Sequence, residues 1–251
     1  MNYNNIFVNR IGITPQSFMR TNKIVQVFKP CSFLKFDGGK LIESTNINLL
    51  DVNFKNHIKY ETNSNTDINC IRIKGKFIKS FLEEKSPNNI LGANDYFMTN
   101  DSNIIIPETK TTPSALETFG CKLIETNTGF SLNCDQELPL FEVSIGEEYV
   151  QEYLLQPGLG NGFYIEKHDT PHYHQPLDFN AGGFLILGQV IKDEIILTKF
   201  KIPFGCGIYT GPNVLHSDAY LVGNYHVVYT KTPNYSTYLF VNPANSIVNV
   251  Q

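Results

Sequence analysis

HDTPHYHQPLDFNAGGFLILG, residues 168–188, places three histidines within seven residues and then continues into an apolar segment. The chain of 251 residues has only six histidines, so half of them lie here. Side chains on a β-strand alternate between its two faces, so His172 and His174 would point to the same side, about 6–7 Å apart at Cα. Two neutral imidazoles in this arrangement can bind one Zn, Fe, Ni, Cu or Mn ion. The stretch therefore predicts either a metal site or a polar loop rich in histidine.

Two features further along the chain favour the metal site. Asp178 follows His174 after three residues and could add a carboxylate. The segment PFGCGIYTGPNVLHSDAY, residues 203–220, places His216 after a turn rich in Gly and Pro. Three imidazoles and one carboxylate leave open positions on a five- or six-coordinate metal, as a catalytic metal requires. We therefore predict His172, His174, His216 and Asp178 as the metal ligands.

Glu166 and Asp178 are the candidate catalytic residues for moving a proton. Glu166 and Lys167 precede the histidines, and as neighbours on a strand they point to opposite faces, so at most one of them reaches a substrate. Asp178 cannot act both as a tight ligand and as a free base. Glu166 is therefore the candidate that is compatible with an aspartate ligand.

The rest of the chain predicts an all-β fold. Short alternating or β-branched runs recur between turn residues, which is typical of sandwiches and barrels; they begin near residues 23, 68, 121, 129, 139, 148, 183, 194 and 225. Two short helices are expected near residues 79–85 and 113–119. Residues 138–251 would form the main barrel with the metal site. Residues 1–137 would form a β-rich region that is either a second, degenerate β-domain or an extension of the main barrel.

The composition and charge of the chain argue against nucleic acid and membranes as binding partners. The net charge is −4 and no basic run exceeds two residues, so neither nucleic acid nor an anionic membrane is an expected partner. No apolar run approaches the roughly 20 residues that span a bilayer, and the start MNYNNIFVNR is not that of a secretory signal. Five scattered cysteines without a C-x-x-C pair are expected to be free thiols in a reducing compartment. These features predict a cytoplasmic protein.

The two histidine segments resemble the two motifs of the cupin superfamily. His172, His174 and Asp178 match the core of the first motif, H-x-H followed after three residues by an acid, with Asp in place of Glu. In the second motif, Gly205 and His216 have the family spacing around GPN. Asn213 stands where the family has Gly, and Asn enters the left-handed backbone region at low cost. The resemblance covers about 65 residues and implies a double-stranded β-helix, or jelly-roll, barrel with a central metal.

Departures from the family pattern leave alternatives open. Gly162 lies five residues before His168 rather than His172, so His168 is an alternative first ligand. Alignment on the later Gly188 puts Ala181 at the acid position, which would leave a site of three histidines only.

The resemblance implies a metal-dependent enzyme that acts on a small oxygenated metabolite, a sugar or a keto or hydroxy acid. The reaction would be that of an isomerase or epimerase, or of an Fe(II) dioxygenase. The expected cofactor is a divalent transition metal, Fe, Zn, Mn or Ni, and pairing into a homodimer is also implied. The alternative is a non-catalytic cupin that binds or senses a small molecule.

Overall fold

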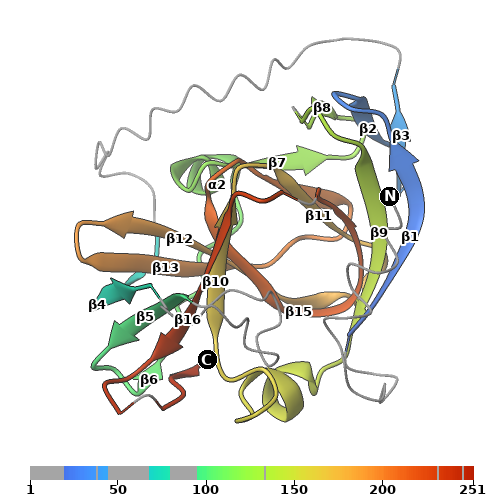
Figure 1. The fold of residues 1–251 in the computed structure, drawn as a ribbon. Helices are drawn as coiled ribbons and strands as arrows, with labels where there is room; N and C mark the ends of the chain where they lie inside the picture. Colours follow the sequence, from blue (N-terminus) through green and yellow to red (C-terminus); the bar gives the residue numbers. More distant parts are fainter. Residues whose placement is uncertain are drawn as a thin grey trace.

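The computed structural model describes residues 20–37, 39–44, 68–79, 95–132, 134–230, 232–244 and 246–251. Strands predominate in this part of the chain, so the predicted all-β class is confirmed (Figure 1). None of the helices in these ranges is long and apolar enough to cross a membrane.

Twelve strands form one large sheet, and the long strand β15 (Leu215–Val228) belongs to both of its halves. The first half follows the order β7 (Cys121–Glu125), β14 (Cys206–Thr210), β11 (His172–Pro176), β15, β9 (Leu138–Ile145) and β1 (Arg20–Phe28). The second half follows the order β15, β12 (Gly182–Ile191), β13 (Glu194–Phe200), β4 (Ile71–Ile78), β5 (Asp95–Thr99), β16 (Tyr235–Val241) and β10 (Tyr164–His168). The last strand, β10, pairs again with β15 through Glu166 and His216, so the second half returns to the strand on which it began.

Smaller sheets flank the large one. One contains β3 (Lys40–Glu43), β2 (Phe33–Asp37) and β8 (Gly129–Ser131), and the other pairs β6 (Asn103–Ile104) with β17 (Asn249–Val250).

Strand β15 changes partners near its middle. Its first part pairs with β12, and its second part pairs with β9 and β11 (Figure 1). Gly223 lies at this change with φ of 92°, and Gly183 on β12 has φ of 73°. A Cβ at Gly183 would collide with the carbonyl oxygen of Tyr220, so glycine is required for β12 to approach β15 there.

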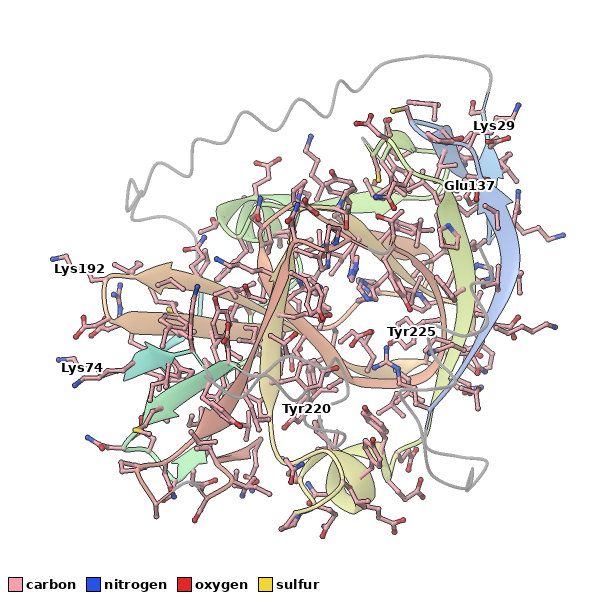
Figure 2. The ribbon with its side chains drawn as sticks, viewed as in Figure 1. Lys29, Lys74, Glu137, Lys192, Tyr220 and Tyr225 are labelled. Atoms are coloured by element: carbon pink, nitrogen blue, oxygen red, sulfur yellow. The ribbon has the colours of Figure 1, made fainter. Side chains whose placement is uncertain are left out.

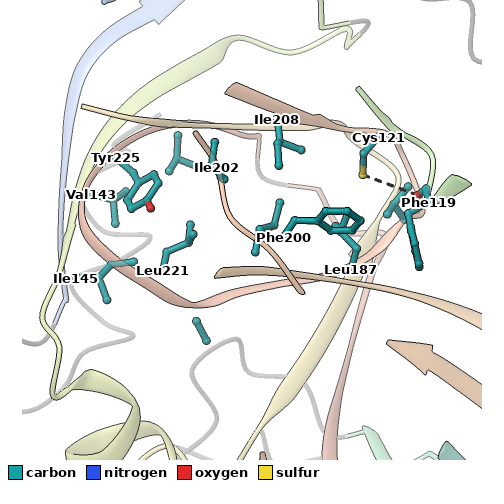
Figure 3. Packing of buried hydrophobic residues seen from close by; sticks show 14 of the residues in the cluster. Phe119, Cys121, Val143, Ile145, Leu187, Phe200, Ile202, Ile208, Leu221 and Tyr225 are labelled. Carbon is teal, nitrogen blue, oxygen red and sulfur yellow. Dashed lines mark hydrogen bonds between the residues drawn. The ribbon is translucent and has the colours of Figure 1, made fainter. Parts of the chain in front are cut away.

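A buried apolar cluster fills the space between the two halves. Alternate residues in the second part of β9 contribute to it, as do Leu187, Phe200 and Leu221 from strands across the sheet (Figure 3). Burial of side chains of this size stabilises a fold by about 1.5–3 kcal/mol each. Tyr220 and Tyr225 of β15 (Figure 2) donate hydrogen bonds to the carbonyl oxygens of Val250 and Gly182, at 2.9 and 2.6 Å. This packing holds in place the strands that also carry the polar residues.

Local predictions agree with the structure at most positions, with one clear correction. Helix α2 (Pro113–Thr118) begins at Thr112, whose side chain accepts a hydrogen bond from the Ala115 amide, and it confirms the predicted second helix. The other expected helix, at 79–85, lies outside the described residues except for its first position. The strand expected from residue 148 is wrong, because this segment forms the short π-helix η1 (Val150–Leu154). Its aromatic rings at Tyr149 and Tyr153 stack at 5.6 Å, the four-residue spacing of a helical turn rather than the alternation of a strand.

Four of the described strands from residues 1–137 join the large sheet, whose other strands come from residues 138–251, while β2, β3, β6 and β8 belong to the smaller sheets. Strand β1 pairs with β9, β4 with β13, β5 with β16 and β7 with β14. Of the two alternatives for the N-terminal region, these pairings correspond to an extension of the main sheet.

Candidate metal centre

Four side chains converge at the junction of β10, β11 and β15. Glu166 and His168 come from β10, His172 from the start of β11 and His216 from β15. Each offers one ligand atom, and these four atoms all lie within 4.8 Å of one another. Such a buried group of three imidazoles and one carboxylate could hold a metal ion.

Strand pairing explains how these residues meet. Glu166 is the direct cross-strand partner of His216, and directly opposed residues have their side chains on the same face of the sheet. His168 follows two residues later on β10 and therefore shares this face. The connection from His168 to β11 is held by Asp169, whose carboxylate accepts hydrogen bonds from Thr232 Oγ1 and Asn234 Nδ2 at 2.6 and 2.7 Å. This short, fixed connection brings His172 back beside His168.

The hydrogen bonds of His216 orient its free nitrogen toward the centre. Its Nδ1 lies 2.9 Å from the carbonyl oxygen of Val214, which can only accept, so Nδ1 carries the proton. In the neutral ring the lone pair is then on Nε2. This Nε2 lies 3.1 Å from His172 Nδ1 and 3.5 Å from Glu166 Oε1. The carbonyl thus sets the tautomer that a metal ligand needs.

His168 presents a buried nitrogen for which the structure provides no partner. Its Nδ1 lies 3.2 Å from Thr170 Oγ1, whereas its Nε2 is buried and makes no hydrogen bond. The His168 ring centroid lies 4.0 Å from that of His172 and 5.0 Å from that of His216. An unsatisfied buried polar atom costs about 1–3 kcal/mol. A metal ion at the centre would remove this cost, so the residues present fit a metal.

Burial keeps the three imidazoles neutral. It lowers the pKa of His168 to about 4, with repulsion from His216 as a further cause, and it lowers the pKa of His216 to about 4. Burial and the neighbouring His168 and His216 lower the pKa of His172 well below its usual value. Near neutral pH the nitrogen lone pairs are therefore available for a metal rather than occupied by protons.

These pKa shifts predict that the metal-free protein loses stability in mild acid. The unfolded histidines take up protons near pH 6.5, whereas the folded ones resist until about pH 4. Between these values the unfolded state binds more protons, so the free energy of unfolding falls as the pH falls, by up to about 1.4 kcal/mol per pH unit for each such histidine. Urea unfolding of the metal-free protein at pH 7, 6, 5 and 4.5 measures this slope. We expect a shallower slope for His168→Gln, and an unchanged slope would contradict the prediction.

The structure brings together part of the predicted ligand set. His172 and His216 belong to the group, and so does His168, the alternative first ligand. His174 lies on the same face of β11 as His172, but it is not a member of the metal group. Its Nε2 faces Asp218 Oδ2 at 3.7 Å.

Asp178 requires a correction. Its Oδ1 accepts hydrogen bonds from the backbone amides of Asn180 and Ala181, and its Oδ2 accepts one from Asn224 Nδ2. Aspartate commonly accepts such bonds from the backbone that follows it in a turn. Asp178 therefore fixes the turn between β11 and β12 and lies outside the metal group, so its predicted roles as ligand and as catalytic residue have no support in its position.

Glu166 is a member of the candidate metal group that sequence reasoning placed in another role, as a proton-transfer residue. A signal for its position is present in the chain. The spacing that relates His172, His174 and Asp178 recurs six residues earlier in Glu166, His168 and His172. There the acid stands in the first of the three positions rather than the last. Gly160 then stands five residues before the first ligand, as the first motif requires.

A second polar group lies beside the metal group and was not predicted. Arg20 of β1 donates two hydrogen bonds to Asp218 of β15, from Nη2 to Oδ2 at 2.6 Å and from Nη1 to Oδ1 at 3.2 Å. Burial raises the pKa of the Asp218 carboxyl, but the Arg20 charge and His174 lower it by more, so the pKa lies far below its usual range. Asp218 is therefore ionised and held in place on the face that also carries His216.

The remaining sequence candidates lie elsewhere. His226 is on β15 opposite Gln175 and Glu142, outside the metal group. Cys206 is the half-buried first residue of β14 and also lies outside the metal group. Asn213 has φ of 62°, so it lies in the left-handed backbone region that Asn enters at low cost. His57 falls outside the described residues.

No protein-family model matches the chain, and no curated protein matches it significantly. Membership of the cupin superfamily therefore stays a prediction from the two motifs.

Proposed function

We propose that this protein is a metal-dependent enzyme of the cupin type that acts on a small oxygenated metabolite. One observation carries the proposal: three neutral imidazoles and the Glu166 carboxylate offer their ligand atoms within 4.8 Å of one another. Four protein ligands leave one or two positions of a five- or six-coordinate ion for a substrate or O₂. The jelly-roll arrangement belongs to the same proposal, and the return of β10 to β15 at the metal group supports it.

The donor set favours Fe, Mn, Zn or Ni, since imidazole and carboxylate suit these ions and the group contains no thiolate. When bound, such an ion would polarise a substrate oxygen or, as Fe(II), take part in oxidation. The protein's own contribution is to hold the ligands and keep the surroundings dry. Leu187 opposes His216 on β12, and the Tyr229 ring lies 5.0 Å from that of His172 and stacks on Phe141.

The positions of the carboxylates favour the dioxygenase version over the isomerase version. An isomerase needs a group that moves a proton, and Glu166 and Asp178 were the two candidates. Glu166 lies among the metal-ligating atoms, and both oxygens of Asp178 are hydrogen-bonded in a turn. A dioxygenase requires no separate carboxylate base. We therefore place Fe(II)-dependent oxidation first and isomerisation second.

Metal analysis and oxygen uptake test this proposal. Protein purified without an affinity tag is expected to carry metal at about one ion per chain, and its removal by EDTA should lower the Tm, because a ligand that binds only the folded state stabilises it. Oxygen consumption by the Fe(II)-loaded protein is then measured with small sugars and with keto and hydroxy acids.

Each outcome separates the alternatives. Oxygen uptake with one class of compound supports the dioxygenase, whereas bound metal without uptake favours the isomerase. Absence of metal, with a Tm that EDTA does not change, would contradict the enzyme and favour a non-catalytic binding or sensor protein. His216→Ala is the matched control, since its Tm should not respond to EDTA.

A further inference from the structure

We propose that His174 is a second anchoring residue of the metal centre and that it accepts a hydrogen bond from a hydroxyl group of the bound ligand. The site would then take a small polyhydroxylated acid or sugar rather than a simple keto acid. This inference rests on the proposed function, because it requires a ligand bound at the metal.

His174 is buried beside the metal group, its Nε2 faces Asp218, and its Nδ1 has no hydrogen-bond partner. It lies two residues after His172 on β11, so both side chains point to the same face, and their ring centroids are 5.6 Å apart. The side chain is fully buried, and neither ring nitrogen makes a hydrogen bond. Buried polar atoms almost always have a partner, so the unpaired Nδ1 next to a candidate site points to a partner that arrives with the ligand.

Asp218 determines which nitrogen of His174 is left to accept. The carboxylate is fixed by its two hydrogen bonds from Arg20, and its Oδ2 lies 3.7 Å from His174 Nε2. This distance is too long for a hydrogen bond, but the negative charge favours the tautomer with the proton on Nε2. Nδ1 then carries a lone pair, and a lone pair needs a hydroxyl or N–H donor. Arg20 and Asp218 are thus positioning residues that act through His174.

The spacing defines the size of the ligand. Residues two apart on a strand are separated by about 6–7 Å at Cα, so a ligand that reaches from the metal to His174 needs a chain of about three or four carbons. One end would coordinate the metal through oxygen, and a hydroxyl further along would donate to Nδ1. A sugar acid with a hydroxyl on each carbon meets both requirements.

A pair of matched ligands tests the inference. Threonate and 2-hydroxybutanoate share the carboxylate and the 2-hydroxyl group, but only threonate has further hydroxyls. Calorimetric titration of the Zn(II)-loaded protein is expected to show at least about tenfold tighter binding of threonate, the effect of one buried hydrogen bond. His174→Phe should remove this preference without weakening 2-hydroxybutanoate. His174→Asn should keep part of it, because its Oδ1 stands near the position of the imidazole Nδ1.

The zinc content of each sample separates failure of this inference from failure of the proposed function. Equal binding of the two ligands by zinc-loaded wild-type protein would overturn the inference and leave the metal centre intact, and this comparison needs no variant to fold. If His174→Phe loses zinc as His172→Ala does, His174 is a metal ligand and the anchoring role is wrong. If the wild-type protein binds no zinc and no other transition metal, the proposed function fails and the inference fails with it.

Discussion

His216→Ala is expected to lower the affinity for the metal by at least about 100-fold, since it removes a ligand whose second-shell partners alone are worth 10–100-fold. The ligand atom of His216 is well defined, because the Val214 carbonyl fixes the tautomer that leaves the lone pair on Nε2, and Nε2 faces both His172 and Glu166. Metal content after dialysis against a trace of chelator, with a calorimetric titration of the metal-free protein, measures the loss.

His226→Ala provides the matched control for this experiment. His226 lies on the same strand as His216 but outside the metal group, and it is only partly buried. Metal content should therefore stay at the wild-type level. Equal metal content in the two variants would overturn the ligand assignment, and a loss in both would point to damage to β15 rather than to a lost ligand.

Arg20→Leu is expected to lower the free energy of unfolding by about 3–5 kcal/mol, which is the usual effect of removing one partner of a buried ion pair. The substitution leaves the Asp218 carboxylate buried without its two hydrogen bonds, and its charge is then uncompensated. Urea unfolding at pH 7 measures the change. The double substitution Arg20→Leu with Asp218→Leu should recover much of the loss, because it also removes the stranded charge.

An exposed ion pair serves as the comparison for Arg20. Arg72 lies 3.5 Å from Glu194, but more than half of its side chain is exposed. Arg72→Leu should therefore change the free energy of unfolding by less than about 1 kcal/mol. A similar loss for Arg20→Leu and Arg72→Leu would show that burial of the Asp218 pair has little energetic effect.

The candidate ligands show that alternation along one strand does not predict which side chains converge on a metal site. Alternation on a strand correctly placed His172 and His174 on one face, yet only His172 joins the metal group. A shared face is a property of one strand, whereas convergence on a point depends on which strand lies next to it. Strand β10 lies beside β15 and brings Glu166 opposite His216, and no spacing within residues 168–178 contains this pairing.

Asp178 illustrates the opposite case, in which a local interaction prevailed over a motif. Asp178 follows His174 with three residues between them, which matched the acid of the first cupin motif apart from Asp in place of Glu. The carboxylate instead accepts two backbone amide hydrogen bonds within its own turn. Short polar side chains that start turns find such partners without any long-range contact, so a turn aspartate is a weak candidate for a ligand.

Short-range information in the chain was sufficient for the all-β class, for most strands and for helix α2, because periodicity and turn chemistry act over a few residues. It also singled out the two segments that carry His172 and His216. The contribution of Glu166 and the Arg20–Asp218 pair, whose partners are 198 positions apart, depended on strand neighbours across the sheet. Which strands become neighbours depends on the burial of apolar side chains throughout the core. A short segment of sequence does not carry that information.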